Sequence, residues 1–401
     1  MKRASLFAVL VALTCTAGHA QPFLPRADDQ VIERLPYKAT DPVMAELRAA
    51  REQLSQQPDN LRLALRLATR YVELGRINGD PRYAGYAQAA LMPWWDREHP
   101  PQEVLLMRAT LRQRIHDFDG ALADLDGVLQ SNPWNAQARL TRATVLQVQG
   151  RYPAARSDCV ALQRLTQALV ATTCLAGVGS VTGHLHESYD QLRRALEQNP
   201  EADPTIRSWV LTSLAEMAAH AGMAREAESQ FRDALTLDPS DFYLLGAYAD
   251  FLLDQHRPAE VVQMLAGNTR ADPLLLRYGL ALAAEGSPEL PGTTEQLRER
   301  FAASHLRGDR VHLREEARFT LHVLHDATHA LQLAKENWVV QREIADVRIL
   351  LEAALATGDA PTIVSVNTWL QESQLEDIAI QRLVQTSLHP DPGPIRTKQR
   401  P

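Results

Sequence analysis

The sequence predicts an all-α protein, built as a solenoid of stacked antiparallel helix pairs. Strand signals are nearly absent, because no alternating Val, Ile or Thr runs lie between Asn-Gly or Asp-Gly turns. Stretches of about 12 to 16 residues that are rich in Ala, Leu and Arg follow one another instead. The chain also resembles itself at an offset of 34 residues. Together these observations favour a repeat protein over two or three separate globular domains.

Four dipeptides are expected to end helices, because proline removes a backbone hydrogen bond and disfavours helix in the residue before it. They are Asn132-Pro133, Asn199-Pro200, Asp238-Pro239 and Asp272-Pro273. Their spacings are 67, 39 and 34 residues, and the first is close to two periods of 34. The spacing of these predicted helix ends therefore agrees with a regular repeat.

The self-similarity extends to individual side chains. The matched pairs are Arg108-Ala109-Thr110 with Arg142-Ala143-Thr144, Phe118 with Tyr152, Ala121 with Ala155, and Asp124 with Asp158. A fixed period of this length is typical of solenoids, in which one helix pair buries its apolar face only by stacking on the next. Arg108 and Asp124 are predicted to pair within one repeat, and Arg142 and Asp158 within the next. We expect these pairs to be partly exposed and to contribute less than ~1 kcal/mol each.

The pattern within a period resembles the tetratricopeptide repeat (TPR), which has small, Gly, aromatic and Pro residues at fixed positions. Residues 205–239 match it best, through Ala215, Gly222, Ala227, Phe231, Ala234 and Pro239. Residues 136–165 match through Ala143, Gly150, Tyr152 and Ala155, and residues 167–200 through Ala176, Gly183, Ala195 and Pro200. Leu105 and Leu211 replace the family's early Trp. The resemblance implies an exported bacterial TPR protein, a right-handed superhelix of about nine helix pairs.

The N-terminus reads as an export signal. Lys2 and Arg3 precede an apolar stretch from Leu6 to Leu13, and Gly18-His19-Ala20 offers a small-x-small cleavage site. We therefore expect cleavage after Ala20 and a periplasmic or secreted protein. A lipoprotein anchored at Cys15 is the less favoured alternative, because Thr14 and Leu13 precede that cysteine.

The predicted organisation has four parts. They are a signal peptide at 1–20, an extended lead-in at 21–40, a TPR-like solenoid at 41–387 with irregular pairs at 61–92 and 273–303, and a disordered tail at 388–401. No stretch after residue 20 approaches the length of a membrane span. The net charge of −7 argues against a nucleic-acid partner, because phosphate binding needs a basic surface.

Cys159 and Cys174 are the two cysteines of the mature chain. In the TPR register they fall on the second helix of one repeat and the first helix of the next, which pack together. A disulfide is therefore expected in an oxidising compartment. The alternative is that both are small buried residues between helices.

Signs of catalysis or of a bound cofactor are lacking, and we expect no enzyme. Gly177-Val178-Gly179-Ser180 is not preceded by a strand and does not complete a dinucleotide motif. His322, His325 and His329, with His305 and His312 upstream, suggest a metal-handling protein as the alternative function. Against it, the repeat pattern places a turn near Asp326, which would scatter these imidazoles.

The favoured function is that of a scaffold or adaptor in the cell envelope, which binds a protein or peptide partner in a groove. The TPR resemblance implies that the first helix of each pair lines this groove. The residues carried over are Glu103, Leu106, Thr110, Gln113, Gln137, Leu140, Thr144, Gln147, Trp209, Thr212, Glu216, Tyr243 and Asp250. Trp94 and Trp95 are a second candidate contact, and packing under their loop is the alternative.

Overall fold

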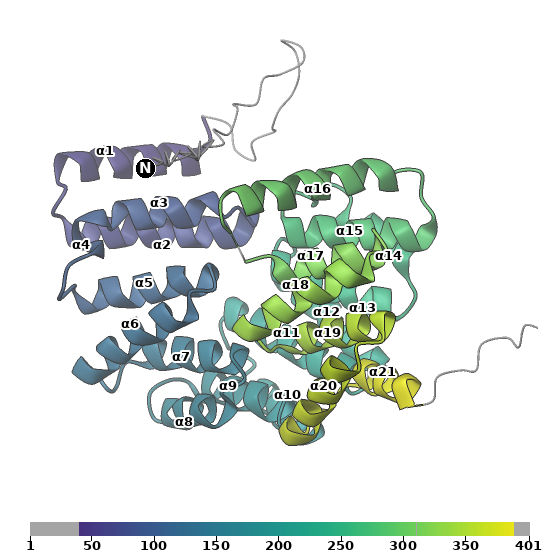
Figure 1. Ribbon diagram of the computed structural model, residues 1–401. Coiled ribbons are helices and arrows are strands. Elements are labelled where there is room, and N and C mark those ends of the chain that lie inside the picture. The colour runs from purple at the N-terminus through teal and green to yellow at the C-terminus, as the bar shows by residue number, and fades with distance from the viewer. Residues whose placement is uncertain (1–39, 310, 389–401) are drawn as a thin grey trace, which may run out of the picture. The chain divides into compact units, whose positions relative to one another are not determined.

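The computed structural model describes residues 40–309 and 311–388, and within them it contains 21 helices and no strand (Figure 1). The predicted signal peptide, nearly all of the lead-in and all but the first residue of the predicted tail lie outside these residues. The chain divides into two units at Glu46, inside helix α1 (Pro42–Gln56). The fold described below belongs to the second unit, which begins at Leu47.

Nine antiparallel helix pairs follow α1 in the described part of the chain. They are α2 (Leu61–Asn78) with α3 (Arg82–Ala90), α5 (Gln102–Arg114) with α6 (Phe118–Ser131), α7 (Ala136–Val148) with α8 (Tyr152–Leu162), α9 (Ala168–Ser180) with α10 (Leu185–Glu197), α11 (Pro204–His220) with α12 (Ala224–Leu237), α13 (Phe242–Asp254) with α14 (Pro258–Leu265), α15 (Asp272–Glu285) with α16 (Leu290–Leu306), α17 (Leu313–His322) with α18 (Ala327–Val340), and α19 (Ile344–Thr357) with α20 (Ala360–Ser373). Two helices stand outside the pairs, the short α4 (Met92–Trp95) and the final α21 (Ile378–Leu388).

The α11–α12 pair shows how the sequence produces one repeat. Asp203 caps α11 by accepting a hydrogen bond from the Thr205 amide. Gly222 ends the turn at a φ of +76°, a conformation that glycine adopts without steric cost. Ala215 and Ala227 are fully buried, so the two backbones can approach closely. The predicted small and glycine positions are thus those that close the hairpin.

Successive pairs are joined by larger side chains. The Phe231 ring of α12 is almost fully buried and stacks on Tyr248 of α13, with 5.2 Å between the ring centroids. Each first helix also packs on the first helix of the following pair from α5 onward. The predicted all-α class and the stacking of helix pairs are therefore confirmed.

The buried apolar residues form separate clusters along the stack. One runs through α9 to α15, a second through α5 to α9, and a third through α17 to α21. A smaller cluster around Phe301 and Phe319 joins α15 and α16 to α17. The last pairs therefore have a core of their own, and the cluster around Phe301 and Phe319 joins it to the preceding pairs at α17.

Candidate functional site

The predicted groove residues of α5 and α7 lie on one face of each helix. Glu103, Gln137 and Thr144 are exposed. The remaining five residues of this part are partly exposed, namely Leu106, Thr110, Gln113, Leu140 and Gln147. Apolar and polar side chains, with the acidic Glu103, thus share a surface that solvent reaches.

The residues predicted on α11 are less uniform. Trp209 is 39% exposed, whereas Thr212 is buried and donates its hydroxyl hydrogen bond to the Ser208 carbonyl. Thr212 therefore contributes to helix packing and presents nothing to a partner in this arrangement. Glu216 lies nearer the C-terminal end of the same helix and contacts α13.

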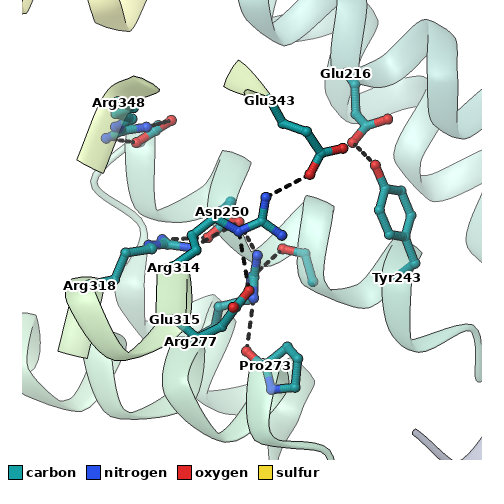
Figure 2. A network of polar contacts seen from close by, with 12 residues as sticks. Glu216, Tyr243, Asp250, Pro273, Arg277, Arg314, Glu315, Arg318, Glu343 and Arg348 are labelled. Atoms are coloured by element: carbon teal, nitrogen blue, oxygen red, sulfur yellow. Dashed lines mark hydrogen bonds and ion pairs between the residues drawn. The ribbon is translucent and has the colours of Figure 1, made fainter. Parts of the chain in front are cut away.

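Glu216 and Tyr243 meet across the α11–α13 contact. The Tyr243 hydroxyl donates a hydrogen bond of 2.7 Å to the Glu216 carboxylate (Figure 2). Tyr243 is 59% exposed, so solvent reaches its ring. Burial raises the pKa of Glu216 to about 7, opposed by the Tyr243 hydrogen bond and reinforced by the charges of Glu343 and Asp250. The charge of Glu216, which accepts its hydrogen bond, raises the pKa of Tyr243 well above its ordinary value.

Asp250 is held by two guanidinium groups from later helices. Arg277 of α15 and Arg318 of α17 approach its carboxylate at 2.5 Å and 2.8 Å (Figure 2). Burial by itself would raise the pKa of Asp250, but these two cations hold it well below its usual range. Asp250 is therefore already engaged by its own chain.

Asp250 belongs to a larger set of contacts in which the last helices cross the middle of the stack. Arg348 of α19 forms an ion pair with Asp254 of α13 at 2.8 Å. The Arg342 amide donates to the Val148 carbonyl at 2.7 Å, at the α7–α8 turn. We call these contacts the seam. Its residues are Arg318, Arg342, Arg348 and Glu376 on one side, and Val148, Leu185, Asp250 and Asp254 on the other.

The seam follows the turns of successive pairs. The Glu376 carboxylate accepts a hydrogen bond of 2.7 Å from the Leu185 amide, at the α9–α10 turn. Ile378 lies beside Gly222, at the α11–α12 turn. Residues separated by about 70 to 190 positions in the sequence thus lie side by side, as the overlap of the yellow-green and teal helices in Figure 1 illustrates.

Arg314 links the seam to the Glu216–Tyr243 pair. Its guanidinium donates to the Glu343 carboxylate at 2.7 Å, and Figure 2 shows the Glu343 and Glu216 carboxylates pointing toward one another. His116, in the α5–α6 turn, lies near Arg314. Burial and the charge of Arg314 lower the pKa of His116. Acidic, basic and aromatic groups therefore converge from the α5–α6 turn, α11, α13, α17 and the residue before α19.

Sequence reasoning missed the residues that occupy this end of the predicted groove. Arg314 and Arg318 are four positions apart on α17, and Arg348 lies on α19. Periodicity alone would assign such arginines to a solvated helix face. Only the curvature of the stack brings them to Glu343, Asp250 and Asp254.

The histidine cluster that suggested metal binding is dispersed. His322 ends α17 and bonds Glu352 at 2.9 Å, His325 sits in the turn at a φ of +59°, and His329 lies in α18. His305 instead contacts Glu316. Among the described residues, no group of three or more potential metal ligands occurs. Nothing in the geometry favours the metal-handling alternative.

The disulfide joins Cys159 of α8 to Cys174 of α9, with 5.4 Å between the Cα atoms. Both side chains are buried. The bridge links the second helix of one pair to the first helix of the next, as the repeat register predicts.

The predicted Arg–Asp pairs are present, but their carboxylates are not exposed. Asp124 binds Arg108 at 2.6 Å, and Asp158 binds Arg142 at 2.7 Å. The Asp side chains are only 4% and 2% exposed. The expectation of partly exposed carboxylates was wrong, because a second arginine also binds each of them.

Trp94 and Trp95 pack within the fold. Trp94 is buried, and the Arg108 guanidinium lies 5.9 Å from the ring centroid of Trp95. The packing alternative therefore holds for Trp94. The Trp95 ring lies against Arg108, the arginine of the first Arg–Asp pair.

The helix pairs are tetratricopeptide-like. Solved structures similar to this chain include a thermophilic TPR protein of Thermus thermophilus, with 22% identity over 48% of this chain and 98% of that one and a TM-score of 0.38. A tetratricopeptide repeat protein of Parabacteroides merdae has 14% identity, coverages of 77% and 99%, and a TM-score of 0.37. Human IFIT1, a dimer with m7Gppp-AAAA, has 13% identity, coverages of 86% and 86%, and a TM-score of 0.41.

These likenesses carry no conclusion about a partner, and the fold assignment rests on the geometry described above. No family model matches the chain, and no curated protein matches it. In the described segments, every helix is too short or too polar to cross a membrane.

Proposed function

We propose that the protein is a non-catalytic scaffold that binds a protein or peptide partner on the predicted groove face of α5 and α7. The observation that carries this proposal is the difference between the α5–α7 end and the α11–α13 end of the predicted groove. Glu103, Gln137 and Thr144 are exposed, whereas Asp250 is held by arginines of the same chain. The α5–α7 part is where the chain leaves its first helices accessible.

The chemistry of this part suits a segment of polypeptide. Glutamine amides both donate and accept hydrogen bonds, as a peptide backbone does. Leu106 and Leu140 are partly exposed between these polar groups and can bury apolar side chains of a partner. A rigid stack of helix pairs presents such a surface without ordering itself first, so binding costs the scaffold little conformational entropy.

We place this scaffold in the cell envelope. The predicted export signal and the Cys159–Cys174 bridge support this, because disulfides persist in oxidising compartments. The net charge of −7 favours a protein partner over nucleic acid, and we propose no cofactor.

Site-specific photo-crosslinking in cells tests the proposal. A photoreactive residue at Gln137 on α7 is expected to capture the same partner repeatedly, whereas one at the exposed Arg156 on α8 is expected to capture none. Thr144→Arg should abolish the Gln137 crosslink, because a long cation then projects from the binding face. Ser157→Arg introduces the same side chain on α8 and should leave the crosslink unchanged. Equal labelling from both helices, or no effect of Thr144→Arg, would reject this face as the binding site.

A further inference from the structure

The accessible face of α5 and α7 continues onto α2. α2 packs on α5 and α5 packs on α7, so the three helices are stacked in order, as the left half of Figure 1 shows. Each of them carries four solvent-accessible side chains at successive intervals of three, four and three residues. We call these side chains the three-helix face. They are Arg62, Leu65, Thr69 and Val72 on α2, Glu103, Leu106, Thr110 and Gln113 on α5, and Gln137, Leu140, Thr144 and Gln147 on α7.

Leucine recurs at the second place of this order on all three helices. Leu65, Leu106 and Leu140 are each partly exposed. Packed helices lie about 8–10 Å apart, so the leucines form a column with roughly that spacing. The column stops at α9, where Thr173 is buried and the Gly177 carbonyl accepts a hydrogen bond from α7. A partner on this face therefore meets apolar sites about 9 Å apart.

This spacing selects the backbone conformation of an extended partner. A polyproline II helix rises about 3.1 Å per residue with three residues per turn, so every third side chain returns to the same side after about 9.3 Å. A β-strand rises about 3.3 Å per residue and alternates its side chains, so those on one side recur at about 6.6 Å or 13 Å. Polyproline II is therefore the extended conformation that places one apolar side chain on each leucine.

The polar groups beside the leucines favour such a segment over an α-helix. Seven residues of an α-helix span about 10.5 Å, but a helix satisfies its backbone groups internally, whereas polyproline II leaves them free to bond a partner. Thr110 donates its hydroxyl hydrogen to the Leu106 carbonyl, and Thr144 does the same within α7. The threonine oxygens are thus left as acceptors, and the Gln113 amide both donates and accepts. These groups suit an exposed peptide backbone.

Opposite charges occupy the first place of the order on neighbouring helices. Arg62 of α2 and Glu103 of α5 are exposed, and neither forms an ion pair with any residue of the described segments. Gln137 has the same place on α7 and is neutral. A segment that lies along the face complements these charges with an acidic residue at α2 and a basic residue at α5. Such pairs fix the register of a bound partner.

We propose that the three-helix face binds an extended protein segment in the polyproline II conformation, with an apolar residue at every third position. An acidic residue flanks the apolar side chain at α2, and a basic residue flanks the one at α5. This assignment rests on the scaffold function for the location of the site. It adds the conformation, the spacing and the charge order of the bound segment.

A synthetic peptide tests the spacing. The probe is Glu-Leu-Pro-Lys-Leu-Pro-Gln-Leu-Pro, made in both chain directions because a polyproline II helix presents the same spacing either way. The control is an isomer of the same composition with leucine at every second position. By fluorescence anisotropy, the full chain is expected to bind the better direction about tenfold more tightly than the isomer, which cannot place a leucine at each site. Equal affinities, or no binding of either probe, would overturn the proposal.

A double-mutant cycle tests the charges. Replacing the probe glutamate by glutamine is expected to weaken binding to the native chain about threefold and binding to Arg62→Gln not at all. Replacing the probe lysine by norleucine should be coupled to Glu103→Gln in the same way. Arg225→Gln removes an exposed arginine of α12 and should retain the threefold loss. A loss that is equal in the native chain and in Arg62→Gln would contradict the proposed register.

Crosslinking from Gln137 is scored separately. If a partner is captured there while no probe binds, the scaffold proposal stands and the polyproline II segment is rejected. If Gln137 captures no partner, the scaffold proposal fails whatever the probe does. The two failures are therefore distinguishable.

Discussion

Asp250 of α13 accepts a 2.8 Å hydrogen bond from Arg318 of α17, although 68 residues separate them. Together with the contacts of Arg342 to Val148 and of Glu376 to Leu185, this pair shows that the stack returns on itself. The pair occupies part of the face that the repeats would otherwise offer to a partner. The α5–α7 part of that face keeps exposed side chains. The scaffold proposal follows from this division.

Gly183→Ala is expected to destabilise the protein more than Gly358→Ala does. Both glycines have a positive φ, +77° and +69°, so alanine introduces backbone strain of about 1 kcal/mol at each. A Cβ at Gly183 would lie 2.9 Å from the Gln374 Cβ, whereas one at Gly358 meets nothing within 4 Å. We expect a further loss of about 1–3 kcal/mol for Gly183→Ala alone, measured by denaturant unfolding. Equal losses would mean that the α9–α10 turn does not contact the end of α20.

Removal of the disulfide is expected to lower the free energy of unfolding by about 3 kcal/mol. The bridge closes a segment with a sequence separation of 15, and it constrains the unfolded chain accordingly. The Cys159→Ser/Cys174→Ser variant should lose this amount and should no longer respond to reductant. A native chain whose unfolding is unaffected by reductant would show that the bridge is not formed.

Arg142→Ala is expected to cost about 2–3 kcal/mol, because it removes a charged hydrogen-bond partner of the buried Asp158 carboxylate and leaves Arg139 as the remaining cation. The matched control is Arg193→Ala on α10, whose ion pair with Glu197 is exposed and should contribute less than about 1 kcal/mol. Thermal and denaturant unfolding of the two variants compare them directly. A loss at Arg142 as small as that at Arg193 would contradict the role assigned to burial.

Much of the fold was accessible from the sequence because local chemistry determines each helix pair. The 34-residue matches located the Arg108–Asp124 and Arg142–Asp158 pairs, and the register placed Cys159 opposite Cys174. In the pair predicted to be irregular at 273–303, Pro291 falls in the first turn of α16, a position that suits proline.

The return of the stack could not be predicted in the same way. It depends on small rotations between pairs that accumulate over several repeats, and no single repeat specifies their sum. The contacts that result, such as Glu376 with Leu185, join turns that are 191 positions apart. The register therefore predicted groove residues on α11 and α13, but it did not predict that Arg314, Arg318 and Arg348 lie at that end.

The central claim, that the last helices cross the turns of the middle pairs, is tested most directly by an engineered disulfide. A Cβ built on Gly150 lies 3.6 Å from the Arg342 Cβ, within the range of natural disulfides. The Gly150→Cys/Arg342→Cys variant is expected to form this bridge on mild oxidation, detected by peptide mass spectrometry. Gly150→Cys/Gly358→Cys is the control, because Gly358 has no neighbour within 4 Å, and it should stay reduced. A Gly150→Cys/Arg342→Cys chain that remains reduced as fully as the control would contradict the account.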